Sequence, residues 1–85
     1  MKIQVTEKDI KNGVRNDPRM CPVALAVKRI LRQPFVTVNH YHITVGHMEG
    51  YAYRSPGEVQ HFIKKFDKCW WPRVFLKPFE FELRD

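Results

Sequence analysis

Hydrophobic residues recur at helical spacing in two stretches of the chain, and the first of these predicts a helix over residues 22–32. Val23, Val27 and Ile30 fall on one side of it, and a cluster of basic residues follows at its end. Pro22 suits the first helical position, where no N–H is needed, and Pro34 ends the helix. A short turn of helix between Thr6 and Gly13 precedes it.

The second helical stretch predicts a helix over residues 56–67. Ser55, Pro56 and Glu58 form the pattern of a capping box, with the serine as N-cap. One side of the helix is apolar and consists of Val59, Phe62, Ile63 and Phe66. The other side is basic and consists of His61, Lys64, Lys65 and Lys68. A phosphate at this helix start is the alternative to capping, and the Glu58 carboxylate argues against it.

Period-two alternation predicts strands over residues 2–6, 35–45, 51–54 and 79–83. The alternation changes phase at Asn39-His40, which predicts a hairpin with a two-residue turn that pairs Val38 with Tyr41. One long strand with a bulge is the alternative. Phe35, Phe75, Phe79 and Phe81 are expected in the core. The order of elements predicts one α+β domain over residues 1–85, in which two helices pack on one face of a four- or five-stranded antiparallel sheet.

The charge pattern favours anionic partners. The net charge is +6, and no acidic residue occurs between Asp17 and Glu49, although four lysines and arginines lie there. There is no long apolar run and no signal-peptide core, so we expect a cytoplasmic protein without a membrane partner.

Catalytic and metal-binding patterns are weak in this chain. Cys21 and Cys69 are best interpreted as buried free thiols, although Cys21 at a helix start could be an activated nucleophile. His40, His42 and His47 lack further ligands nearby, so we expect no metal and no cofactor. Paired carboxylates and phosphate-binding loops are missing from the sequence, and we therefore expect no enzymatic activity.

Cations beside aromatic residues are the chemistry that neutralises phosphates and stacks bases. Tyr41, Trp70 and Trp71 are among the aromatic candidates, beside Tyr51 and Tyr53. The predicted site comprises eight residues: Arg54, Lys64, Lys65, Arg73, Tyr51, Tyr53, His42 and Trp70.

The two ends of the chain resemble a family of small phage and prophage proteins. Those proteins begin with V-T-x-x-D/H-I-x-x-G, continue to C-P-x-A-L-A, and end in F-I-x-x-F-D and P-F-x-F-x-L. The matching residues here are Val5, Thr6, Asp9, Ile10, Gly13, Cys21, Pro22, Ala24, Leu25, Ala26, Phe62, Ile63, Phe66, Asp67, Pro78, Phe79, Phe81 and Leu83. The resemblance leaves residues 35–53 uncovered and implies a viral setting, in which such a protein acts in the host cytoplasm.

These observations together predict a non-enzymatic binding protein that holds a nucleotide or nucleic acid on a basic, aromatic surface. In a viral setting this would be a counter-defence factor that sequesters a nucleotide signal. The alternative is an inhibitor that docks on a host defence or transcription enzyme through its Trp and Tyr side chains. Self-association is open in either case.

Overall fold

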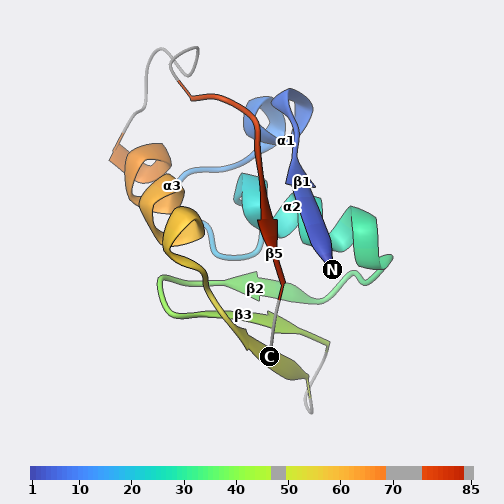
Figure 1. The fold of residues 1–85 in the computed structure, drawn as a ribbon. Helices are drawn as coiled ribbons and strands as arrows, with labels where there is room; N and C mark the ends of the chain where they lie inside the picture. The colour runs from blue at the N-terminus through green and yellow to red at the C-terminus, as the bar shows by residue number, and fades with distance from the viewer. Residues whose placement is uncertain (47–49, 69–75, 84–85) are drawn as a thin grey trace.

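Helices and antiparallel strands alternate along the chain in the computed structural model, which describes residues 1–46, 50–68 and 76–83 (Figure 1). The elements there are β1 (Lys2–Val5), α1 (Glu7–Asn12), α2 (Pro22–Leu31), β2 (Val36–Val38), β3 (His42–Val45), β4 (Tyr51–Arg54), α3 (Gly57–Lys68) and β5 (Phe79–Glu82). The predicted α+β class is confirmed.

The five strands form two antiparallel sheets rather than one. β1 pairs with β5, and β2, β3 and β4 form a second sheet in that order. The central helix α2 contacts both sheets, through β1 and β2. Its buried residues include Val23, Ala24, Ala26 and Val27, which cover more than one side of the helix. A helix with so wide an apolar sector can be covered on two sides, and here a sheet lies on each.

The entry into α2 depends on a close approach between two backbone segments. Pro22 occupies the first turn, as predicted, and the Cys21 Sγ accepts a hydrogen bond from the Ala24 N–H at 3.4 Å. Thr6 and Asp9 cap α1 reciprocally, and the chain then passes Pro22 at Gly13. A Cβ at Gly13 would lie 2.5 Å from Pro22 Cδ, so only glycine fits this crossing.

The β2–β3 hairpin is confirmed, but the predicted register is wrong. Val38 pairs with Ile43 rather than with Tyr41, and residues 39–41 connect the two strands. The Asn39 Oδ1 accepts hydrogen bonds from the backbone N–H groups of Tyr41 and His42 at 2.8 and 2.7 Å. The Asn39 N–H also donates to His42 O at 2.9 Å, so the chain turns at His40 and Tyr41, one residue later than predicted.

The predicted serine cap of α3 is also wrong. The Ser55 N–H donates to Tyr41 O at 2.9 Å, and its Oγ donates to Asn39 O at 3.2 Å, so Ser55 extends the β3–β4 pairing. The helix begins two residues later, at Gly57. The Gln60 Nε2 instead ties the first turn to Ser55 O at 2.9 Å.

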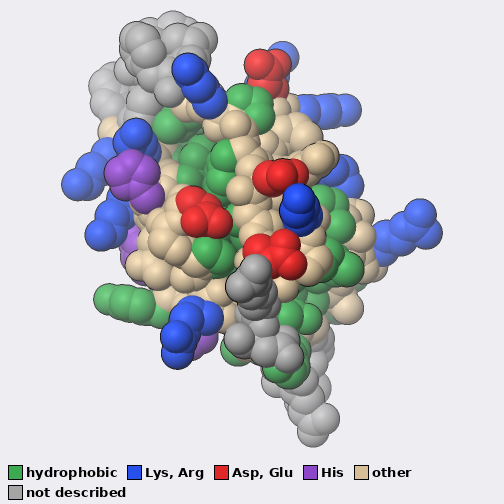
Figure 2. All heavy atoms as spheres, viewed as in Figure 1, with side chains coloured by type: hydrophobic (Ala, Val, Ile, Leu, Met, Phe, Trp, Pro, Cys, Tyr) green, Lys and Arg blue, Asp and Glu red, His purple; other side chains and the backbone are tan. Residues whose placement is uncertain are grey.

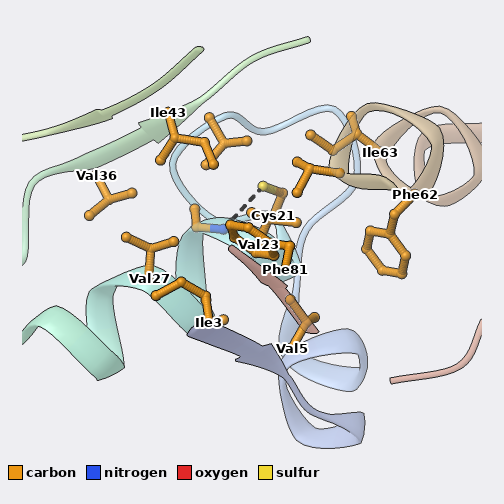
Figure 3. Packing of buried hydrophobic residues seen from close by; sticks show 14 of the residues in the cluster. Ile3, Val5, Cys21, Val23, Val27, Val36, Ile43, Phe62, Ile63 and Phe81 are labelled. Atoms are coloured by element: carbon orange, nitrogen blue, oxygen red, sulfur yellow. Dashed lines mark hydrogen bonds between the residues drawn. The ribbon is translucent and has the colours of Figure 1, made fainter. Parts of the chain in front are cut away.

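The core lies between the two sheets, around α2 and the inner face of α3. Figure 3 shows Ile43 and Val36 on one side of Val23 and Val27, and Ile3, Val5 and Phe81 on the other, with Phe62 and Ile63 beside them. Phe81 is buried and Phe79 partly buried, as expected. Phe35 is not a core residue, because half of its surface (50%) is exposed at the start of β2. Phe75 lies outside the described residues.

Candidate functional site

One exposed side of α3 carries a histidine and three lysines, with Glu58 in the first turn at its N-terminal end. His61, Lys64, Lys65 and Lys68 follow one another at intervals of three or four residues, and all four are exposed, as the sequence predicts. We call these four residues the α3 stripe. Figure 2 shows Lys, Arg and His side chains gathered along this edge of the molecule.

The α3 stripe is not neutralised by any acid in the described ranges. The ion pairs found there involve the N-terminal amine with Glu82, Lys2 with Glu80, and Arg29 with Asp9. Three acids therefore face cations around β1, β5 and α2, and acidic side chains lie around β5 in Figure 2. Asp67, at the end of α3, accepts a hydrogen bond from the Asn16 N–H at 3.0 Å. The charged surface thus has two parts. Around β1, β5 and α2 acids form ion pairs with cations, whereas the α3 stripe forms no ion pair with a described acid.

His42 and Arg54 are direct cross-strand partners of β3 and β4, so their side chains share one face of the sheet. Both are exposed, on the face opposite to the buried Ile43. Arg54 lies three residues before the start of α3. These two predicted site residues are brought together by the structure, at the end of the sheet from which α3 begins.

Tyr51 and Tyr53 lie on the other face of β4. They pair with Val45 and Ile43 and their ring centroids are 4.8 Å apart. Tyr53 packs against the core. Because neighbouring residues of a strand point to opposite faces, these rings do not share a face with Arg54. The predicted combination of Tyr51 or Tyr53 with Arg54 is therefore not formed. Trp70 and Arg73 lie outside the described residues.

Tyr41 is an exposed aromatic residue in the loop between β2 and β3. The residue is 70% exposed, and its carbonyl accepts the Ser55 N–H at 2.9 Å, which joins this loop to the residue after Arg54. The sequence names Tyr41 as an aromatic candidate, but the predicted register paired it with Val38 and gave no reason to prefer it over Tyr51 and Tyr53. Residues 39–41 lie between the two strands, and Tyr41 is exposed there.

The hollow beside the start of α3 is a poor anion site. It encloses about 640 Å³ and is lined in part by Arg54, Gly57, Glu58 and Glu82. Two carboxylates line it against one guanidinium, so an anion would meet repulsion there. The phosphate-binding alternative for this helix start gains no support.

Cys21 is a buried free thiol, as the favoured interpretation held. Burial raises the pKa of the thiol, and this effect exceeds the lowering by the backbone N–H groups of Ala24 and Val23. The alternative of an activated thiol at this helix start therefore gains no support, because desolvation outweighs the lowering of the pKa by these N–H groups. Cys69 and His47 lie outside the described residues. Within the described ranges, no three His, Cys, Asp or Glu residues are grouped so that they could hold a metal ion.

Of the helices that the structure describes, none is long and apolar enough to span a membrane. Comparisons were made with protein-family models, with curated proteins and with solved structures, and no family model, curated protein or solved structure matches this chain.

Proposed function

We propose that this protein is a non-enzymatic binding protein whose α3 stripe holds the phosphate groups of a nucleic acid. The observation that carries the proposal is that the α3 stripe has no acidic partner among the described residues, although the acids around β1 and β5 do have cationic partners. Surface lysines that serve only solubility are commonly interspersed with acids. A row of cations without acids is the electrostatic feature of a nucleic-acid surface.

The dimensions of the α3 stripe suit a phosphate backbone. His61 and Lys68 are seven residues apart, which corresponds to roughly 10 Å along a helix. This is about the length of three steps of one strand at roughly 3.4 Å per step. Lys64, Lys65 and Lys68 occupy roughly 6 Å of this length, so they can reach neighbouring phosphates of one strand.

Arg54, His42 and Tyr41 extend this surface at the end of the sheet. Arg54 supplies a planar donor for a further phosphate, and the His42 imidazole can donate a hydrogen bond. The exposed Tyr41 ring offers a face on which a base stacks. Binding of this kind tolerates many sequences and needs no catalytic group. In the viral setting that the resemblance implies, it would retain a nucleotide or nucleic-acid signal.

Salt dependence tests this proposal directly. We expect a fluorescently labelled twelve-residue oligothymidylate to bind at 20 mM NaCl, as measured by fluorescence anisotropy. With Lys64, Lys65, Lys68 and Arg54 each neutralising one phosphate, the plot of log affinity against log salt should have a slope of about −3, since each contact on a single strand contributes roughly −0.7.

A matched pair of variants locates the surface. The double substitution Lys64→Gln/Lys65→Gln should weaken binding by about tenfold or more at 50 mM NaCl and reduce the slope by about 1.4. Lys8→Gln/Arg32→Gln removes the same charge from exposed positions on α1 and at the end of α2, and should leave the slope unchanged. Equal losses in both variants, or no binding at low salt, would refute the proposal and leave docking on a host protein as the better interpretation.

A further inference from the structure

A second basic pocket lies along the outer edge of β2, away from the α3 stripe. It encloses about 320 Å³, and its lining includes Arg19, Lys28, Phe35, Val36 and Thr37. Three elements contribute: the loop before α2, the last turns of α2, and β2 itself. Figure 1 shows α2 above β2 on the side opposite to β3.

The β2 backbone forms the outer edge of its sheet at this pocket. The Asn39 N–H donates to His42 O, and the Gly46 N–H donates to Phe35 O, so the odd-numbered residues of this stretch bond to β3. The backbone N–H and C=O groups of Val36 and Val38 therefore point to the outer edge of the sheet. The Val38 N–H reaches Pro18 O at 2.8 Å, whereas the Val36 N–H and C=O have no hydrogen-bond partner in the described parts of the chain.

Val36 is only 2% exposed, so its backbone groups are shielded from solvent and are closed to a ligand as well. The half-exposed Phe35 ring and the two cations are the groups that the pocket offers to a bound molecule.

Among the residues that the structure describes, the charged residues that line the pocket are both basic. The Lys28 Nζ donates to Arg19 O at 2.5 Å and lies 3.7 Å from Met20 Sδ, which holds the ammonium beside the pocket. Asp17, the acid nearest to Arg19 in sequence, accepts the N–H groups of Arg19 and Met20 and does not line the pocket. Arg19 and Lys28 thus give this part of the surface a positive charge.

We propose that this pocket binds a single nucleotide. The half-exposed Phe35 ring stacks on the base, and Arg19 and Lys28 hold the phosphate. A pocket of about 320 Å³ is at the small end of ligand sites, which suits one nucleotide better than a strand. The site shares no residue with the α3 stripe, and either proposal can therefore fail without the other.

The test uses AMP as the probe and amide chemical shifts as the readout. We expect saturable shifts at Val36, Thr37 and Gly46 as AMP is added to the full chain. Phe35→Ala should weaken AMP binding about tenfold, because the stacking surface is lost, while Phe35→Tyr should retain it. Arg19→Gln should weaken binding as well, and Lys64→Gln/Lys65→Gln should leave it within twofold.

Inorganic phosphate and a second aromatic residue supply the controls. Phosphate at equal ionic strength should bind at least tenfold more weakly than AMP, because it has no base. Tyr51→Ala removes another exposed ring, outside the pocket, and should not change AMP binding. Equal affinities for phosphate and AMP, shifts confined to α3, or an unchanged affinity in Phe35→Ala would each overturn the proposal.

Discussion

Gly13 shows how one residue without a side chain sets the path of the chain between α1 and α2. Its backbone lies against the Pro22 ring, so a Cβ there would overlap the ring atoms. The ring cannot move away easily, because Pro22 is itself buried in the first turn of α2. The crossing of these two segments therefore requires glycine, for reasons of space rather than of backbone conformation, since φ at Gly13 is −68°.

We predict that Gly13→Ala lowers the free energy of unfolding by about 1–3 kcal/mol, as overpacking of a close contact does. The matched control is Gly57→Ala, because a Cβ at Gly57 meets nothing within 4 Å and alanine favours the helix start. That variant should be neutral or more stable by about 0.5 kcal/mol. Urea unfolding of the two variants measures both effects, and equal stabilities would contradict the assigned role of Gly13.

The raised pKa of Cys21 makes stability depend on alkaline pH. In the unfolded chain the thiol loses its proton near pH 8.5, whereas burial keeps it protonated to higher pH in the folded chain. The unfolded state therefore binds fewer protons in this interval, and the free energy of unfolding falls as the pH rises. Below about pH 8 the thiol has no such effect.

We predict that the Cys69→Ser variant loses up to about 1 kcal/mol per pH unit more than Cys21→Ser/Cys69→Ser above pH 9. Serine keeps a capping acceptor at residue 21 but does not titrate in this range. Urea unfolding at pH 7, 9 and 10 measures the difference. Parallel pH profiles for the two proteins would show that the Cys21 thiol is accessible to water in the folded chain.

At the scale of the elements, Asn39 determines the shape of the β2–β3 hairpin. Its Oδ1 accepts two backbone N–H groups of the loop, and its carbonyl accepts the Ser55 hydroxyl that links the loop to the start of α3. We predict that Asn39→Ala lowers the free energy of unfolding by about 1–2 kcal/mol, because two loop donors lose their acceptor.

Asn39→Asp is the matched comparison, since aspartate keeps the acceptor oxygen and should retain most of the stability. Hydrogen exchange at the Tyr41 and His42 amides should accelerate in Asn39→Ala and much less in Asn39→Asp. Unchanged exchange in Asn39→Ala would mean that the loop is held by the strand pairing alone.

The sequence predicts the helices and strands better than the strand register and the element boundaries. Helix α2 and the apolar side of α3 follow from spacing alone, because burial of one side is a local pattern. The register at Val38 and the start of α3 at Gly57 do not, since both depend on bonds between distant residues. Ser55 has the local pattern of a helix cap, but its N–H is taken by Tyr41, fourteen residues earlier in the chain.

The sequence predicts which basic residues of the candidate site are exposed, but it does not predict which aromatic residues lie beside them. Lys64 and Lys65 lie on the exposed side of α3, as the helical spacing predicts. Arg54 and Tyr53 are neighbours in sequence, yet the pleat of β4 directs them to opposite faces. The pleat alone therefore separates Arg54 from Tyr51 and Tyr53, and the predicted combination overlooked it. The half-exposed Phe35 escaped prediction for a related reason, because it precedes a strand whose edge position was unknown.

For the whole molecule, the unpaired cations should give stability and binding opposite responses to salt. The net charge is +6, and the α3 stripe places like charges three and four residues apart, which is mildly unfavourable in a helix. Raising NaCl from 20 to 300 mM shortens the screening length to below about 8 Å and weakens this repulsion. We predict that the melting temperature of the free protein rises over this range while its affinity for the oligothymidylate falls.

Lys64→Gln/Lys65→Gln separates the two responses. Removing two of the repelling charges should reduce the salt-induced rise in melting temperature and, by the same change, the salt-induced loss of affinity. Lys8→Gln/Arg32→Gln changes the net charge equally but leaves the α3 stripe intact, and should keep both responses close to those of the original protein. Scanning calorimetry and anisotropy over one salt series measure them together. If the melting temperature falls with salt instead, ion pairs outweigh repulsion across the surface, and the α3 stripe is not the unneutralised row of cations on which the binding proposal depends.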